Sequence, residues 1–378
     1  MNSVSLVKCD DYQKETVKKS LDEAINLIDG LDFVKPNMKI VIKANLLTAK
    51  DPKTATTTHP ALIYRICELL IEKGAQVCVA DSPGGPFNRA ALKRVYNVSK
   101  MTDVLETGAT LNDDFTFSNV NMPESKVLKN ADIVNFILNA DAVINFAKLK
   151  THGFMGYTGA IKNLFGIIPG TVKAEYHYRM PDLDAFAQML IDLNEFVKPN
   201  LTLIDAVVGM DGNGPSNGNP FQIGAIIASK NPHAADVIAN KIISQNPTDV
   251  PTLKLAIQSG LINENEIECL GENIDNLITN SFKTIPAAYN NMHFILPFKP
   301  LNTLLNKLLA SYPQVSKSKC VGCQECCKAC PPKAITMQNN LPVIDRKKCI
   351  KCYCCQELCP IDAMKIHRSP LANFIRHL

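Results

Sequence analysis

The sequence contains little of what characterises several common classes of protein. Tryptophan is absent from the 378 residues, aromatic residues make up 6%, and no run approaches the ~20 consecutive apolar residues of a transmembrane helix. The net charge of +4 is too small to indicate a nucleic-acid binder. The N-terminal residues do not combine a basic segment with an apolar one, as a secretory signal would. We therefore expect a cytoplasmic protein with no membrane span and no nucleic-acid partner.

Two common nucleotide-binding motifs are missing as well. The chain has no Walker A sequence and no G-x-G-x-x-G after a strand-like segment, so a standard nucleotide site is not expected. The apolar fraction of 46% and the charged fraction of 20% are ordinary for a folded chain. The length favours two to three domains.

Short apolar segments alternate with helix-like segments along most of the chain. The apolar segments are rich in valine and isoleucine and are continuously apolar, which is typical of strands covered on both faces. The expected strands are residues 38–47, 75–83, 141–150, 201–209 and 221–229. The expected helices are residues 16–29, 60–73, 183–196 and 232–244. This alternation predicts an α/β fold with a mostly parallel sheet flanked by helices.

The composition changes after this region. We expect an α/β domain over residues 1–285, an amphipathic connector over 286–315, a cysteine-rich module over 316–368 and a short tail over 369–378. The connector is interpreted as a helix packed on its own domain, with docking on a membrane surface as the weaker alternative.

Cysteine is the residue type that stands out. The chain has 14 cysteines, and 10 of them lie between Cys320 and Cys359. A disulfide framework would need an exported protein, so a metal or cluster site is expected instead. The spacing C-x2-C-x2-C-x3-C-P occurs twice, at residues 320–331 and 349–360. Zinc sites also use C-x2-C pairs, but eight evenly used cysteines in a repeated pattern disfavour zinc.

The repeated run resembles that of the bacterial two-cluster ferredoxins, in which the fourth cysteine of each run ligates the other cluster. Carried over position by position, the resemblance implies two [4Fe–4S] clusters in a small α+β ferredoxin-like domain. One cluster would be held by Cys320, Cys323, Cys326 and Cys359, and the other by Cys349, Cys352, Cys355 and Cys330. Cys327 and Cys354 are adjacent to these ligands and are either bystanders or alternative ligands.

The cysteine-rich module is more basic than the rest of the chain. Residues 316–368 hold ten Lys and Arg against four Asp and Glu, whereas the remaining residues hold 30 against 32. A basic rim would steer an acidic redox partner protein toward the module. It would equally offset the charge of anionic clusters, and the sequence does not choose between the two.

Polar side chains follow the expected strands, at the edge where open α/β sheets bind ligands. Lysines supply positive charge, and glycine loops let backbone N–H groups approach an anion. The edge is therefore predicted to bind a small anionic substrate. The candidate substrate-binding residues are Lys43, Asn45, Asp81, Ser82, Lys148, Thr151, Lys162, Asn163 and Asp211.

Two residues of the same region are candidates for catalysis. Lys148, Lys150 and His152 share one face if the strand continues through them, because side chains alternate along a strand. His152, beside Lys150, is then placed to act as a general acid near neutral pH. Each residue taken singly is as well explained by a solvated side chain or a helix cap, so it is the cluster over 148–163 that favours a functional site.

Four segments of the α/β domain are distinctive when taken together. They are KANLL at 43–47, DSPGG at 81–85, NFAKLKTHGFMGYTGAIKNLFG at 145–166 and GMDGNGP at 209–215. They resemble the domain-of-unknown-function family 362, whose members often carry a C-terminal ferredoxin module. One departure is Ala147, which stands where a proline often precedes the first lysine. The resemblance implies an iron–sulfur protein and names no substrate.

Three functions are compatible with these features. The first is an iron–sulfur electron-transfer protein that couples its electrons to reduction of a small anionic substrate in the α/β domain, which would make it a ferredoxin-coupled oxidoreductase. The second is a plain electron carrier whose large domain docks a partner enzyme. The third is a scaffold that delivers clusters or metals. A cluster module alone would carry electrons, so the long domain before it favours the first.

Overall fold

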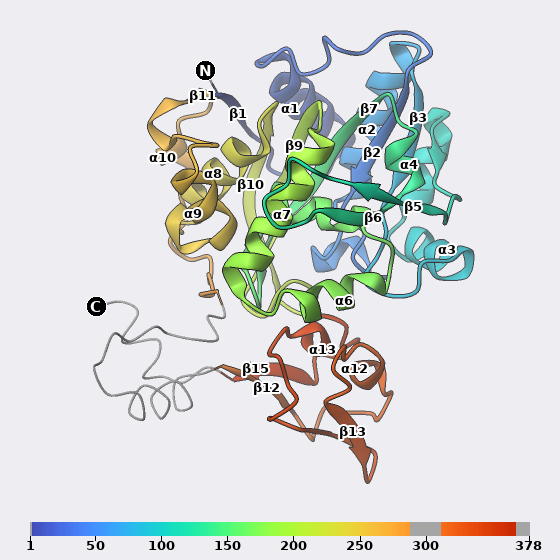
Figure 1. The fold of residues 1–378 in the computed structure, drawn as a ribbon. Helices are drawn as coiled ribbons and strands as arrows, with labels where there is room; N and C mark the ends of the chain where they lie inside the picture. Colours follow the sequence, from blue (N-terminus) through green and yellow to red (C-terminus); the bar gives the residue numbers. More distant parts are fainter. Residues whose placement is uncertain (1, 288–310, 368–378) are drawn as a thin grey trace.

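The computed structural model describes residues 2–287 and 311–367, and a mixed, mostly parallel sheet forms the centre of the first part (Figure 1). The strand order is β11-β1-β10-β9-β7-β2-β3-β4, with β8 paired to β7. The strands are β1 Asn2–Lys8, β2 Lys39–Ala44, β3 Gln76–Ala80, β4 Thr110–Leu111, β7 Ala142–His152, β8 Gly156–Thr158, β9 Leu201–Asp211, β10 Asn219–Ser229 and β11 Ile267–Gly271. From β4 through β3, β2 and β7 to β9 the neighbours are parallel, whereas β10 is antiparallel to both β9 and β1.

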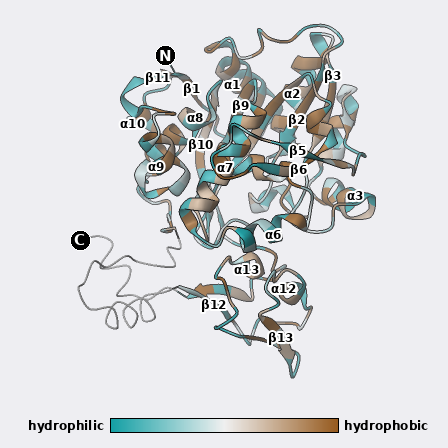
Figure 2. Ribbon diagram, in the orientation of Figure 1, coloured by the Kyte–Doolittle hydropathy of each residue, from teal (hydrophilic) through white to brown (hydrophobic). Residues whose placement is uncertain are grey.

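Helices cover both faces of this sheet, and the alternation of side chains along each strand explains why. Ile42 and Ile144 pack into one hydrophobic cluster, while Val41 and Val143 pack into the cluster on the other face. One face carries α1 Lys14–Asn26, α2 Pro60–Glu72 and α3 Arg89–Val98, and the other carries α5 Ala160–Asn163, α7 Leu183–Val197, α8 Pro232–Ile242 and α9 Pro251–Gln258. Apolar colouring accordingly concentrates in the central strands (Figure 2).

Smaller elements complete the α/β region. They are α6 Val172–Arg179, the antiparallel pair β5 Phe117–Asn121 and β6 Asn130–Val134, α4 Asn135–Leu138 and α10 Ile274–Leu277. Of these, α6 lies closest to the C-terminal region (Figure 1).

The predicted fold class is confirmed, and the five predicted strands and four predicted helices are all present. Strand β1 was not predicted, because serines at positions 3 and 5 interrupt its apolar residues. The antiparallel direction of β10 was not predictable either, since direction depends on pairing between segments and not on the composition of one segment.

The C-terminal region is a small α+β unit. It consists of two antiparallel strand pairs, β12 Tyr312–Val315 with β15 Met364–His367 and β13 Ile335–Gln338 with β14 Leu341–Ile344. Two short helices, α12 Glu325–Lys328 and α13 Cys354–Glu357, each follow a cysteine loop. Most of the predicted connector (286–315) and the predicted tail (369–378) lie outside the described residues.

The two regions meet through hydrogen bonds between α13 and the glycine-rich loop after β9. The Gln356 side chain donates to the backbone oxygens of Asn213 and Gly214, each at 3.2 Å. Ser216 Oγ donates to the carbonyl of residue 357 at 2.6 Å, and Asn217 Nδ2 donates to that of residue 359 at 3.0 Å. The loop that the sequence suggested for ligand binding therefore holds the cysteine-rich unit in place.

Within residues 2–287 and 311–367, no helix has the length and apolar character needed to cross a membrane.

Candidate functional site

Eight of the clustered cysteines line two cavities in the C-terminal unit. The first cluster cavity is lined by Cys320, Cys323, Cys326 and Cys359. The second cluster cavity is lined by Cys330, Cys349, Cys352 and Cys355. Each cavity thus receives three cysteines from one run and the fourth from the other run. This is the grouping that the ferredoxin resemblance implies for two [4Fe–4S] clusters.

The surroundings of these cysteines fit iron–sulfur clusters. The backbone N–H of Ala334 donates to Cys330 Sγ, and that of Ala363 donates to Cys359 Sγ, both at 3.2 Å. Such N–H···S bonds stabilise thiolates and tune the potential of a cluster that they hold. In the part of the chain that the structure describes, no group of three or more His, Cys, Asp and Glu side chains is placed to hold a single metal ion.

A third cavity lies between the α/β region and the C-terminal unit, and we call it the polar cavity. Its volume of about 70 Å³ is enough for a few water molecules or a small anion. The parallel strands β2, β3 and β7 all end at this edge, and α5, α6 and α13 supply the other walls. The charged residues that line it are Lys43, Lys150, Lys162, Lys173, Asp81 and Glu357. Four lysines against two carboxylates give the cavity an excess of positive charge, which favours an anion.

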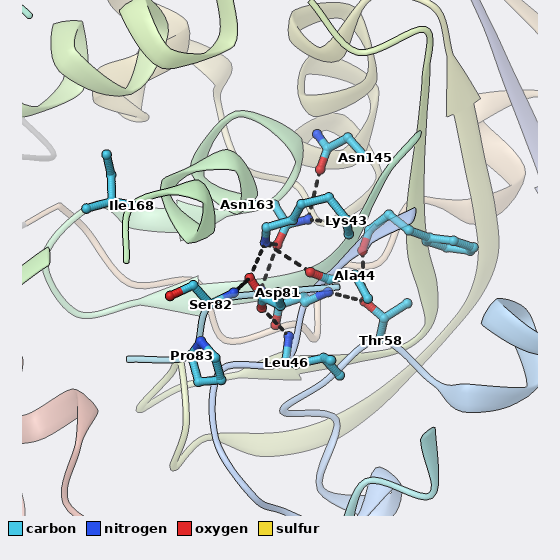
Figure 3. Close-up of polar contacts among 12 residues, drawn as sticks. Lys43, Ala44, Leu46, Thr58, Asp81, Ser82, Pro83, Asn145, Asn163 and Ile168 are labelled. Carbon is cyan, nitrogen blue, oxygen red and sulfur yellow. Dashed lines mark hydrogen bonds and ion pairs between the residues drawn. The ribbon is translucent and has the colours of Figure 1, made fainter. Parts of the chain in front are cut away.

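Lys43 belongs to the framework of the polar cavity and offers nothing to a ligand (Figure 3). Its ammonium lies 2.8 Å from Asp81 Oδ1 and donates to Asn163 Oδ1 and to the Ala44 carbonyl, each at 2.9 Å. These three acceptors use all three protons of an ammonium. Burial lowers the pKa of Lys43, and Asp81 opposes that shift. Asp81 also accepts hydrogen bonds from the backbone N–H groups of residues 46 and 82, so it organises the loops.

Lys173 on α6 is used in the same way. Its ammonium has four oxygen acceptors within 3.3 Å, two on Ser82 and the carbonyls of Pro83 and Ile168. Burial without a carboxylate partner lowers the pKa of Lys173 to about 7. Lys173 ties α6 to the loop after β3 and so closes one wall of the cavity.

Lys150 and Lys162 keep protons available to a ligand. The Lys150 ammonium donates to Asn45 Oδ1 and to the Thr56 carbonyl, each at 2.8 Å, which leaves its third proton free. Among the described residues, the Lys162 ammonium has no hydrogen-bond partner and lies 5.4 Å from the ring centroid of Phe165. Burial lowers the pKa of both lysines, and that of Lys150 falls to about 7 even though Glu357 opposes the shift.

His152 at the end of β7 presents one fixed tautomer to the cavity. Its Nδ1 accepts hydrogen bonds from the backbone N–H groups of Phe154 and Met155, at 3.1 and 3.2 Å. The proton of the neutral ring must therefore be on Nε2, which has no hydrogen-bond partner among the described residues. Burial lowers the pKa of His152 to about 4. The geometry favours a neutral N–H donor over the general acid that the sequence suggested. Lys150 and Lys173 both have a pKa of about 7. Lys150 is the better placed of the two for proton transfer, because the Lys173 ammonium is already surrounded by four acceptors.

Besides Lys173, three ionisable lining residues were not predicted. His177 on α6 stacks on Phe186 with ring centroids 4.3 Å apart, and burial lowers its pKa to about 3. Cys354 and Glu357 reach the cavity from α13, in the other region of the chain. Burial acts to raise the pKa of Glu357, but His152 and Lys162 hold that pKa well below its usual range. No motif surrounds His177, and the cluster-side residues could be found only once the two regions were placed together.

The predicted site residues are only partly brought together. The polar cavity is lined by Lys43, Asn45, Asp81, Ser82, Lys150, His152, Lys162 and Asn163.

Lys148, Thr151 and Asp211 are placed elsewhere. Lys148 is paired with Asp205 at 2.7 Å. The Thr151 hydroxyl donates to the Gly212 carbonyl, and Asp211 accepts from the backbone N–H of Lys283. Their polar groups are paired with side-chain or backbone groups of the α/β region, so we do not assign them to substrate binding.

Comparison with known families agrees with this architecture. A family model described as a domain of unknown function, DUF362, matches residues 40–241, which is more than half of the chain. The chain belongs to the DUF362 family. A second model, a 4Fe–4S dicluster domain, matches residues 312–360 of this DUF362 protein. Its C-terminal domain is thus of the ferredoxin type, which supports [4Fe–4S] cluster binding and an iron–sulfur electron-transfer role.

Known proteins similar to this DUF362 chain include a thylakoid-associated protein of Synechocystis sp. It is 28% identical over 69% of this chain and 80% of its own length. Among solved structures, the lactate racemase apoprotein from Thermoanaerobacterium thermosaccharolyticum is 16% identical with a TM-score of 0.36, over 58% of this chain and 53% of that one. A protein from Thermotoga maritima is 11% identical with a TM-score of 0.32, over 67% of this chain and 60% of that one. The match therefore spans little more than half the length of these solved chains.

Proposed function

We propose that this protein passes electrons from its C-terminal domain to a small anionic substrate held in the polar cavity and thereby reduces that substrate. In this proposal residues 1–285 are the substrate domain and residues 316–368 the electron-transfer domain. The cysteines that line each cluster cavity hold one [4Fe–4S] cluster.

One observation supports this proposal above the others: helix α13 is shared between the second cluster cavity and the polar cavity. Cys355 lines the second cluster cavity, while its helix neighbours Cys354 and Glu357 line the polar cavity. Cys359, two residues beyond Glu357, lines the first cluster cavity. A substrate in the polar cavity would therefore lie against the helix that supplies cluster ligands, which is the arrangement that electron transfer requires.

The free donors of the polar cavity set the roles of its residues. Lys162 supplies the positive charge that attracts the anion, because its ammonium makes no hydrogen bond within the described residues. The His152 Nε2–H donates to an oxygen of the substrate. Lys150, whose pKa of about 7 is matched to neutral pH, transfers a proton as the substrate gains electrons.

Bound [4Fe–4S] clusters would supply electrons one at a time, so a two-electron reduction would need two successive deliveries, which an external redox partner would replenish. Two protons complete the reduction. Lys150 provides one, and water that enters the cavity provides the other and reprotonates Lys150.

The test is substrate-dependent reoxidation of the reduced protein under anaerobic conditions. Cluster absorbance is followed while groups of small anionic metabolites are added to the wild type and to Lys162→Met. Because the Lys162 ammonium has no hydrogen-bond partner to lose, the substitution removes charge and leaves the surrounding network intact. We expect one group of anions to reoxidise the wild type and the variant to need at least about tenfold more of it, the weight of one hydrogen bond to a charged group.

Lys328→Met is the matched control, since Lys328 is an exposed lysine of the first cysteine run. It should behave as the wild type does. If no anion reoxidises the wild type, the proposal is wrong and a plain electron carrier becomes the better explanation. If the anion reoxidises Lys162→Met as well as the wild type, reduction does not take place in the polar cavity.

A further inference from the structure

Glu357 is the one acidic group of the polar cavity that the framework does not use. Asp81 is held by Lys43 and two backbone N–H groups. The Glu357 carboxylate, by contrast, makes no ion pair with any lysine of the described residues. Its nearest ionisable partner is His152, with Glu357 Oε2 at 3.6 Å from Nε2. That distance is too long for a hydrogen bond.

The hydrogen bonds between the two domains do not account for the burial of the Glu357 side chain. Hydrogen bonds between them are made by Gln356, by Asn213, which donates to Asp362 Oδ1, and by Asn217. Ser216 bonds to the backbone oxygen of residue 357 and not to its side chain. The Glu357 side chain is nevertheless only 16% exposed and lines the polar cavity. A carboxylate in such a place usually has a partner, because burying an unpaired charge is costly.

The free groups on the two sides of the cavity are complementary. Free donors come from the α/β domain, namely the Lys162 ammonium, the third proton of Lys150 and the His152 Nε2–H. A free acceptor, the Glu357 carboxylate, comes from the electron-transfer domain. A bound molecule that satisfied both sides would accept hydrogen bonds with anionic oxygens and donate one hydrogen bond of its own.

We propose that the polar cavity selects a small anion that carries its own O–H or N–H group, with the anionic oxygens toward Lys162, Lys150 and His152 and the O–H or N–H donating to Glu357. This inference rests on the proposed anion site and specifies its substrate class. An anion without a donor would turn lone pairs toward the Glu357 carboxylate, and the repulsion would weaken its binding. Glu357 is thus a specificity-determining residue that the cluster domain contributes to the substrate site.

Hydrogencarbonate and nitrate form a probe pair that isolates this feature. Both are planar monoanions with three oxygens and similar size, but only hydrogencarbonate has an O–H. Binding of each to the oxidised holoprotein is measured by titration calorimetry in a sealed cell near neutral pH. We expect hydrogencarbonate to bind at least about tenfold more tightly than nitrate, the weight of one hydrogen bond to a charged group.

Two variants sharpen the measurement. In Glu357→Gln the preference should shrink to within about twofold, chiefly because nitrate binds more tightly once the carboxylate is gone. Glu325→Gln is the control, since Glu325 is an exposed glutamate on α12 that pairs with Lys328, and it should keep the wild-type preference. Absorbance at the clusters verifies that both variants are loaded and folded.

Equal binding of the two anions to the wild type, or a preference that survives Glu357→Gln, would overturn the inference while leaving the anion site intact. Failure of both anions to bind would overturn the inference together with the site. Because these titrations involve no electron transfer, they stand apart from the reoxidation test of the proposed function.

Discussion

The two cysteine runs of the C-terminal domain have the same backbone but different surroundings. Residues 29 positions apart repeat the same left-handed conformations, as at Gln324 and Tyr353, with φ of 66° and 61°, and at Lys333 and Asp362, with φ of 51° and 53°. Each run continues into a four-residue helix. Local sequence therefore produced two equivalent loops.

The side chains on these two helices differ in what they contact. In the first run, Glu325 and Lys328 pair with each other at the surface. At the equivalent positions of the second run stand Cys354 and Glu357, and both line the polar cavity. Cys323, which lines the first cluster cavity, is exposed, whereas its equivalent Cys352 is partly buried. The charged pair of the first run is thus at the surface, whereas the second run faces the α/β region.

The largest effect is expected when one cysteine is removed from either cluster cavity. Cys355→Ser and Cys326→Ser should each reduce the iron content from about eight to about four atoms per chain, since each removes a ligand of one [4Fe–4S] cluster. Iron analysis and absorbance measure the loss. Only Cys355→Ser should also abolish reoxidation of the remaining cluster by the substrate, because α13 borders the polar cavity. Equal reoxidation in both variants would contradict the assignment of different roles to the two runs.

The next largest effect is expected on stability, when the charged residues of α12 and α13 are exchanged. Glu357→Lys copies the residue type of Lys328 into the second run and places an unpaired cation beside Lys162 and His152. We expect it to destabilise the protein by about 3 kcal/mol or more, the usual effect of an uncompensated buried charge. The reverse change, Lys328→Glu, is at the surface and should leave the stability nearly unchanged. Chemical denaturation of the holoproteins measures both, and a similar cost for the two would contradict the burial described for Glu357.

The lysines of the two regions should also differ in their response to pH. Burial lowers the pKa of Lys150 to about 7, whereas Glu325 raises that of the exposed Lys328. Lys150 attracts an anion only while its ammonium is protonated. Anion affinity should therefore be highest below pH 7 and fall as the pH rises through about 7, by up to about tenfold per pH unit.

Calorimetric titrations across the pH range test this dependence. Lys150→Met should bind more weakly and show a much smaller decline in affinity around pH 7, with the remainder due to Lys173, whose pKa is also about 7. An unchanged pH dependence in that variant would assign the titration to another group.

The smallest expected effect concerns the contact between the domains. Gln356→Ala removes hydrogen bonds to the backbone oxygens of Asn213 and Gly214 and leaves those oxygens without their donor. We expect a loss of about 1–2 kcal/mol. Cys327→Ala, at the equivalent position of the first run, should change stability by less than about 0.5 kcal/mol. Comparable losses from both substitutions would mean that the contact adds nothing to stability.

Much of the candidate site could be predicted from the sequence, for one physical reason. The carboxyl ends of parallel strands meet at one edge, so residues that follow β2, β3 and β7 had to lie near one another. Lys43, Asp81, Lys150 and His152 were found in this way. What the sequence could not reveal is how many protons of each lysine are already used. Lys43 and Lys162 look alike in the sequence. The first is fully hydrogen-bonded within the protein, whereas the second has no hydrogen-bond partner among the described residues.

The cysteine spacing was a better guide to the cluster residues than the sequence was to the roles of the polar site residues. The repeated spacing resembles that of the two-cluster ferredoxins, and this resemblance implied the grouping of the eight cysteines that line the two cluster cavities. The role of His152 had no such signature. Its tautomer depends on two backbone N–H groups that reach Nδ1 only after the turn beyond β7 has formed.

By itself, the sequence determined the α/β class, the repeated cysteine loops and the polar edge of the sheet, because each follows from periodicity or spacing within a short segment. The tertiary structure alone decided that Cys354 and Glu357 face the α/β region and that His177 and Lys173 line the polar cavity. Those contacts join segments far apart in the chain, and the hydrogen bonds and charges that a buried group finds there depend on the packing of whole domains.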